Sequence, residues 1–473
     1  MTAFVPAYRC GAAPDFHRIP FSSPAIRPGN RWRSSVYHRS IDTRENSREG
    51  VIFMAYRTGL GSDGLGRRRT SRDRRVAGFP ASKSTMVEGS QSKGYVFMQS
   101  TPELTWEILR TAPQYSLRRY GRYLIAELMG EHLVLSTSVQ NGGQAQGIRY
   151  LGNHQSCEGA GHTARHDLVK ALGQEAYHDA VCREIGLPAA EVALMGTAAN
   201  MNYAAIATEE DRDVAVTAVV TAGVQGNATC AGDPTGWREG EHGWEKLDGT
   251  INTMLLINHP LTEGAMARAV MTMTEAKSAA LQRLAVRSLH SSDLATGTGT
   301  DQFAIAAPIA GRYRLTSAST HVKLGELIGR SVREATMEAL RWQNGLESSY
   351  TRSVFAALGS FGLKEATFFD EIAPLLSEAD LALLRKNSKS LFYEPLVAAA
   401  AFAFASVLDR VRYGTLPASA SQEALRQQAA SIAASLSAKP YLWEQFRTQL
   451  NEADPVRLLL RAFALGWSTK WQS

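Results

Sequence analysis

The chain has 473 residues, of which 44% are hydrophobic and 20% charged, a balance that is typical of globular proteins and excludes a fibrous or wholly disordered chain. Its net charge of +6 would suit nucleic-acid binding, but residues 1 to 98 contain 17 Lys and Arg against 7 Asp and Glu, and the remainder contains 34 against 38. The body of the chain is therefore mildly acidic, and nucleic-acid binding is disfavoured.

Residues 1 to 98 form a basic head that is rich in Arg, Ser, Gly and Pro and has no sustained hydrophobic period. We expect most of this head to be disordered. It lacks the apolar core of a secretory signal. Two interpretations stay open: the head belongs to the natural protein, or translation starts at Met86 or Met98 and the upstream residues do not belong to it.

Residues 99 to 345 show the pattern of one mixed α/β domain. The β-rich runs are residues 123 to 139, 192 to 196, 203 to 224, 250 to 257 and 302 to 309. Helices with one apolar face are expected over residues 165 to 185, 262 to 285 and 321 to 343. Thr262 suits the N-cap of the second helix, and Gly345 suits the end of the third. The pattern predicts a mixed α+β sandwich of sheet and packed helices.

Residues 346 to 473 lack strand patterns and predict an all-helical C-terminal domain, interrupted near residues 414 to 420. The longest apolar run, residues 395 to 408, is shorter than the roughly 20 residues of a membrane-spanning helix, so we expect a buried helix and no membrane association. Four scattered cysteines without a Cys-x-x-Cys pair argue against a disulfide framework and fit a reducing cytoplasm.

Loops rich in Gly, Asn and Thr lie at the ends of the predicted strands, where backbone amides and short polar side chains can converge on a ligand. Each loop alone could equally be a plain connection between strands. As a group they predict these substrate-binding residues: Asn141, Asn227, Thr250, Asn252, Thr298 and Thr300.

His321 and Lys323 stand at the predicted start of a helix, where free N–H groups and the positive end of the helix dipole favour an anion or a developing oxyanion. Histidine is also a natural general base near pH 7. The alternative is a histidine that only caps the helix or fills a turn.

Lys277 shares the apolar stripe of its helix with Met273 and Leu281, so its ammonium must reach the surface or pair with a carboxylate. Asp301 and Glu275 are the candidate partners, although Glu275 projects to a different side of the helix. The alternative is a lysine at the edge of the stripe with its charge in water.

Three histidines gather at His154, His162 and His166, and we place His154 among the substrate-binding candidates. The glycines between them make a helical ligand pair uncertain, so no metal site is expected here. Cys157 lies in the same segment but has no local nucleophile signature.

The sequence resembles the adenosylcobinamide amidohydrolase family (CbiZ) over about residues 120 to 345. The resemblance rests on five segments in the same order and with similar gaps: residues 221 to 233, 249 to 258, Met-Thr-Met-Thr-Glu-Ala-Lys at 271 to 277, Ala-Thr-Gly-Thr-Gly-Thr-Asp at 295 to 301, and Thr-His-Val-Lys-Leu-Gly-Glu-Leu-Ile at 320 to 328.

The resemblance implies hydrolysis of the amide that joins the corrin ring to aminopropanol in adenosylcobinamide, giving adenosylcobyric acid for corrinoid salvage. The cobalt corrinoid is then the substrate, and no cofactor is implied. Some relatives accept complete cobamides, so remodelling of pseudocobalamin-like forms is a further activity that the resemblance allows. No oligomeric state is predicted.

Amide hydrolysis needs a nucleophile, oxyanion donors and an acid for the leaving amine. Our hypothesis from the sequence makes His321 the base or acid, oriented by Asp301 or Glu275, with Lys323, Asn227 and the backbone amides of residues 298 to 301 polarising the carbonyl. Lys277 is a further catalytic candidate. The nucleophile stays open between water and a threonine hydroxyl such as that of Thr250. The rival functions are a corrinoid-binding protein without catalysis and a hydrolase of the same fold with another amide substrate.

Overall fold

The computed structural model describes residues 104 to 158, 164 to 234 and 250 to 472. The predicted basic head, and His162 with it, lie outside the described residues. Within the described part, two large β-sheets, one two-stranded sheet and four α-helices form a domain up to residue 344, and helices without strands follow it. This arrangement confirms the expected sandwich of sheet and helices with a helical C-terminal region.

The two sheets pack face to face. The first sheet contains five strands in the order β1 (Glu107–Ala112), β2 (Tyr115–Tyr120), β3 (Tyr123–Leu128), β6 (Tyr150–Gln155) and β7 (Val192–Thr197). The second sheet contains six strands in the order β5 (Gly143–Ala145), β4 (His132–Ser136), β13 (Gln302–Pro308), β11 (Ile251–Ile257), β9 (Val214–Ala222) and β8 (Ala205–Asp211). A short ladder joins β10 (Ala228–Thr229) to β12 (Gly297–Thr298).

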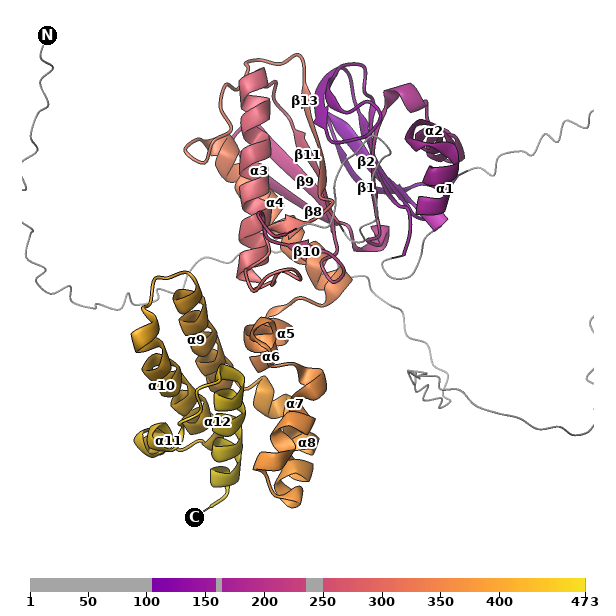
Figure 1. Cartoon of the computed structure of the whole chain (residues 1–473). Helices are drawn as coiled ribbons and strands as arrows, with labels where there is room; N and C mark the ends of the chain where they lie inside the picture. The colour runs from indigo at the N-terminus through magenta and orange to yellow at the C-terminus, as the bar shows by residue number, and fades with distance from the viewer. Residues whose placement is uncertain (1–103, 159–163, 235–249, 473) are drawn as a thin grey trace, which may run out of the picture. The chain divides into compact units, whose positions relative to one another are not determined.

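Helices cover the outer face of each sheet, so the domain has four layers (Figure 1). Helices α1 (Ala164–Leu172) and α2 (Gln174–Glu184) lie on the first sheet, and α3 (Glu263–Arg283) and α4 (Lys323–Asn344) lie on the second. The alternation of the strands explains the layering. In β11, for example, Met254 and Leu256 pack between the sheets while Leu255 and Ile257 pack against the helices.

The bounds of two predicted helices are close to those observed. Thr262 caps α3 by accepting a hydrogen bond from the backbone of Ala265, and α4 ends at Gly345, which has a positive φ of 65°. The helix predicted over residues 165 to 185 is two helices. Gly173, with φ 82° and ψ 163°, breaks it into α1 and α2 because that conformation cannot continue a helix.

The strand pattern over residues 123 to 139 also divides in two. A turn at Gly130, with φ 83°, separates β3 in the first sheet from β4 in the second. Residues 203 to 224 likewise form a hairpin, in which Arg212 has a φ of 56° between β8 and β9. The sequence pattern predicts each segment as one strand-rich run, although charged residues flank both turns, with Glu131 after the first and Glu210 before the second.

The sandwich has two ends that matter for function. Strands β11 and β13 are parallel, and β9 runs against them, so Ile251 pairs with Ala222 and Ile257 pairs with Val216. We call the end where β11 and β13 begin the Asp301 edge. We call the end where they finish, beside the turn between β8 and β9, the hairpin edge. The seven residues of β11 separate the two edges by about 20 Å.

The helical region buries its own core of phenylalanine, leucine and alanine side chains. Its helices are α5 (Ser348–Thr351), α6 (Val354–Leu358), α7 (Glu365–Ile372), α8 (Glu378–Phe392), α9 (Pro395–Arg412), α10 (Ala418–Ser437), α11 (Trp443–Gln449) and α12 (Pro455–Lys470). As expected, the apolar run forms a core helix, because Val397, Ala401 and Phe404 of α9 are buried. Among the described residues, a single helix long and apolar enough to cross a membrane is not found; α8 and α9, bent by 80°, meet that criterion only as a pair.

Candidate active site

Lys277 and Asp301 form an ion pair at the Asp301 edge. Lys277 lies near the end of α3, and its Nζ contacts Oδ2 of Asp301, which directly precedes β13. Their side chains are 14% and 19% exposed, so the pair is largely shielded yet still reached by solvent. An ion pair in such a position is well ordered and can act on a ligand through a weakly screened charge.

The other carboxylate oxygen of Asp301 accepts three hydrogen bonds from two neighbouring segments. The donors are the backbone amide of Ile251 at 3.0 Å, the backbone amide of Thr298 at 3.1 Å and the hydroxyl of Thr298 at 2.5 Å. Asp301 therefore joins α3, β11 and β12 through one side chain. These bonds fix the carboxylate in position and leave the Thr298 hydroxyl with a proton acceptor.

Gly297 allows this arrangement because it has no side chain. A β-carbon at position 297 would lie 2.6 Å from Nζ of Lys277 and closer still to Oδ2 of Asp301. Real β-carbons do not approach other atoms so closely, so any larger residue would displace the ion pair. In the Gly-Thr-Gly-Thr-Asp segment, the backbone at Gly297 thus lies close against the ion pair of Lys277 and Asp301.

Buried amides continue the polar network between the two sheets. Nδ2 of Asn252 donates to Oδ1 of Asn153 at 2.9 Å, and Nδ2 of Asn153 donates to the hydroxyl of Thr221 at 2.7 Å. All three side chains are at most 2% exposed. Because Asn153 lies in the first sheet and the other two lie in the second, these bonds tie the sheets together at the Asp301 edge.

Thr250 links this network to the loop that carries Asp301. Its hydroxyl lies 2.5 Å from the carbonyl oxygen of Thr300 and 3.1 Å from Oδ1 of Asn252, so these two acceptors share its one proton. Across the loop, the buried Asn227 accepts a hydrogen bond at its carbonyl from Gly299 and contacts the Thr300 hydroxyl at 3.5 Å. The structure therefore gathers Asn227, Thr250, Asn252, Thr298 and Thr300 around Lys277 and Asp301.

His321 and Lys323 lie at the other end of the sandwich. Lys323 begins α4 and pairs with Glu326 at 2.6 Å. The hydrogen bond and the charge of Glu326 raise the pKa of Lys323, and the charge of Asp211 in the β8–β9 hairpin makes a smaller contribution in the same direction. That neighbourhood belongs to the hairpin edge, and His321 is exposed two residues earlier. The structure does not bring either residue to Asp301.

The remaining predicted residues are also apart from the ion pair. Glu275 is exposed on α3 and forms no hydrogen bond or ion pair with a described residue. Asn141, with φ 57°, donates to the carbonyls of Ala189 and Val192 and so holds a loop. His154 is 2% exposed, and its ring nitrogens bond the carbonyl of Met195 and the hydroxyl of Tyr177 beneath α2. The side chain of His166 lies outside the described set.

Three residues of this site were not among the predicted ones: Gly297, Asn153 and Thr221. A signal existed for the two polar ones, because each interrupts an apolar strand at a position that faces the other sheet. For Gly297, only its place in the Gly-Thr-Gly-Thr-Asp motif could have indicated a role in the site.

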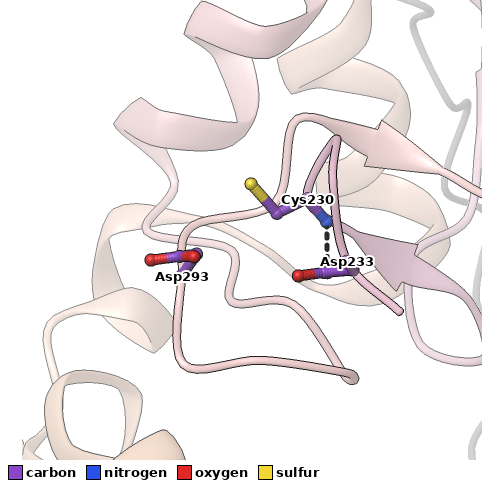
Figure 2. Close-up of side chains that lie close together, drawn as sticks. All are labelled: Cys230, Asp233 and Asp293. Carbon is purple, nitrogen blue, oxygen red and sulfur yellow. Dashed lines mark hydrogen bonds between the residues drawn. The ribbon is translucent and has the colours of Figure 1, made fainter.

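Cys230, Asp233 and Asp293 form a second cluster beside β10, with ligand-type atoms within 4.8 Å of one another (Figure 2). Oδ2 of Asp233 accepts from the Cys230 amide at 2.7 Å and from the Ser288 hydroxyl at 2.5 Å. Burial alone would raise the pKa of Asp233, but such hydrogen bonds outweigh it and lower that pKa to about 2.

The other two members of this cluster, Asp293 and Cys230, also interact with neighbouring protein groups. Oδ1 of Asp293 accepts from the Tyr413 hydroxyl at 2.8 Å, and Oδ2 pairs with Arg412 at 3.1 Å. Burial and the two carboxylates raise the pKa of Cys230. The cluster therefore acts as a clamp for the loop that leads into β12, with its carboxylates already satisfied by the protein.

Comparisons with known proteins agree with the expected family. Residues 108 to 348 match the family model described as adenosylcobinamide amidohydrolase. A relative from Methanocaldococcus jannaschii, the "Uncharacterized protein MJ1613", is 34% identical over 236 residues, which cover 47% of this chain and 88% of that protein. The match to the crystal structure of the PH0078 protein from Pyrococcus horikoshii OT3 covers 50% of this chain and 82% of that chain at 11% identity, with a TM-score of 0.25.

Proposed function

This chain belongs to the adenosylcobinamide amidohydrolase family, and from that membership we propose that it hydrolyses the amide between the corrin ring and aminopropanol in adenosylcobinamide. The products are adenosylcobyric acid and free aminopropanol, and the corrinoid is the substrate rather than a resident cofactor. The observation that carries the proposal is the ion pair of Lys277 and Asp301, with the Thr298 hydroxyl bonded to the same carboxylate at a solvent-accessible edge.

In this proposal the Thr298 hydroxyl is the nucleophile and Asp301 is the proton acceptor. The hydroxyl oxygen attacks the amide carbon, and its proton passes to the carboxylate that already accepts its hydrogen bond. Thr250 is less suited, because the acceptors of its hydroxyl are the Thr300 carbonyl and the Asn252 amide rather than a carboxylate. A water molecule activated by Asp301 is the other route.

Lys277 supplies the positive charge that amide cleavage requires. The carbonyl oxygen becomes an oxyanion in the tetrahedral intermediate, and the ammonium of Lys277 stabilises it. Collapse of the intermediate breaks the carbon–nitrogen bond, and the leaving nitrogen takes the proton from Asp301 to give neutral aminopropanol. Water then hydrolyses the Thr298 ester, which releases adenosylcobyric acid and restores the hydroxyl.

Product analysis of the full-length protein tests this function. We expect mass spectrometry to detect adenosylcobyric acid and aminopropanol in equal amounts after incubation with adenosylcobinamide. Unchanged corrinoid that stays bound through gel filtration would favour a binding protein instead. Neither turnover nor retention would mean that the substrate is a different amide.

A matched pair of lysine substitutions tests the site separately. Lys277→Met should lower kcat by about 10²- to 10³-fold, because it removes the charge opposite the oxyanion. Lys323→Met removes an exposed lysine at the hairpin edge and should leave kcat within about twofold of the parent. Equal loss in both variants, with folding checked by circular dichroism, would contradict the placement of the site at the Asp301 edge.

A further inference from the structure

A cavity of about 250 Å³ opens between the two sheets at the hairpin edge. The turn between β1 and β2, the hairpin of β8 and β9, and the carboxyl ends of β11 and β13 form its walls. It therefore lies at the opposite end of the sandwich from Lys277 and Asp301. We propose that this cavity binds a small hydroxy acid, with the carboxylate on Arg110 and the hydroxyl on His132. This site goes beyond the proposed amidohydrolase function.

His132 lines the cavity and has one ring nitrogen without a hydrogen-bond partner among the described residues. The residue begins β4, is 3% exposed and lies on the same strand face as Val134, which packs between the sheets. Nδ1 is 3.1 Å from the carbonyl of Gly130, which can only accept, so Nδ1 carries the proton. Nε2 forms no hydrogen bond with any described residue.

Burial keeps this imidazole neutral. It lowers the pKa of His132 below its usual range, against the smaller opposing effect of the Gly130 carbonyl. A neutral ring with a proton on Nδ1 has a lone pair on Nε2. The ligand group that this nitrogen selects is therefore a hydrogen-bond donor such as a hydroxyl.

Arg110 supplies a cation in the lining of the same cavity. Its Nε donates to the hydroxyl of Tyr115 at 3.1 Å, and that hydroxyl donates to Thr217 at 2.9 Å. Thr217 in turn shares a hydrogen bond of 2.8 Å with Thr208. This partly buried chain of hydrogen bonds fixes the guanidinium, which pairs with no carboxylate among the described residues. Its terminal nitrogens remain for a carboxylate, the partner that a guanidinium binds most strongly.

The size of the cavity narrows the choice of ligand. Its lining has two cations, Arg110 and Arg212, and two carboxylates, Glu210 and Asp213, of which Asp213 accepts a hydrogen bond from Tyr313 at 3.0 Å. A cavity of about 150 Å³ holds benzene, so this one accommodates roughly ten heavy atoms. The corrin ring is far too large, and aminopropanol, a cation, has the wrong charge for Arg110.

Calorimetry with glycerate as the probe tests the proposal on the full-length protein. Glycerate has both the carboxylate and the hydroxyl, whereas propionate lacks the hydroxyl and glycerol lacks the charge. We expect glycerate to bind with a Kd of about 1 mM or lower and both analogues to bind at least tenfold more weakly. Glycerate should also shift the ring nitrogen resonances of His132 in NMR spectra, which reports contact at the cavity itself.

Substitutions then locate the binding. Arg110→Gln and His132→Gln should each weaken glycerate binding about tenfold, whereas Arg268→Gln, which removes an exposed arginine from α3, should not change it. Turnover of adenosylcobinamide should be unchanged in all three, so a failure here is separate from a failure of the proposed function. No binding of glycerate, equal binding of glycerol, or an unmoved His132 signal would show a cavity that holds water only and would overturn the proposal.

Discussion

Gly297 lies directly against the ammonium of Lys277, so that even a single β-carbon at position 297 would come within 2.6 Å of Nζ. The backbone of β12 and the ion pair of Lys277 and Asp301 therefore occupy one tightly packed unit. The loop motif needs glycine at position 297 because Lys277 and Asp301 occupy the space of a β-carbon. A larger residue there would change the geometry of the ion pair.

Gly297→Ala should lower kcat by about 100-fold, because a displacement of about 1 Å in catalytic groups costs that much. Steady-state turnover of adenosylcobinamide measures the effect. Gly329→Ala is the matched control: it lies inside α4 with no atom within 4 Å of the added carbon, and we expect unchanged turnover and slightly higher stability. Full activity in Gly297→Ala would show that the ion pair is not needed for catalysis.

Two conservative substitutions test the role of the Thr298 hydroxyl. Thr298→Ser keeps the hydroxyl and should retain at least about a tenth of the parent kcat, whereas Thr298→Val keeps the shape and should lose about 10³-fold or more. Mass spectrometry of the quenched reaction should find the corrinoid acyl group on the peptide that contains Thr298. If Thr298→Val retains activity within tenfold of the parent and no adduct forms, water is the nucleophile.

Asn252→Leu should destabilise the domain by about 2 kcal/mol, because it leaves the buried Oδ1 of Asn153 and the carbonyl of Gly196 without their donor. Urea unfolding followed by fluorescence measures this change. Asn202→Ala alters an exposed residue and should stay within about 0.5 kcal/mol of the parent. Equal stability of the two variants would contradict a structural bridge between the sheets.

The variant His321→Ala distinguishes the hypothesis based on the sequence from the active site at the Asp301 edge. The sequence hypothesis makes His321 the general base or acid, so its loss would abolish turnover. The structure places it exposed near the start of α4, at the far end from Asp301, so we expect kcat within about twofold of the parent. A loss of turnover with folding intact would return His321 to the active site.

Much of the fold followed from the sequence because local patterns determine it. Thr262 and Gly345 mark the limits of α3 and α4, as capping rules predict, and Lys277 contacts Asp301, one of the two partners that the apolar stripe on α3 suggested. The division of the strands at Gly130 did not follow, because a turn signal such as a glycine does not reveal that the chain crosses to another sheet.

The rest of the site depends on contacts between distant segments. Asn153 and Asn252 are 99 residues apart, and their contact requires both the register of each sheet and the stacking of one sheet on the other. The place of His321 likewise depends on the direction of α4 across the second sheet. A loop rich in polar residues marks an end of a strand, but the sequence does not say which end of the sandwich that will be.

The most direct test of the central claim is the turnover of adenosylcobinamide by Asp301→Asn beside the parent protein. The amide is isosteric with the carboxylate but cannot take the proton of the nucleophile, so we predict that release of aminopropanol falls by about 10³-fold while the corrinoid still binds. Release at the rate of the parent, from a folded variant, would contradict the assignment of catalysis to Asp301 and its edge of the sandwich.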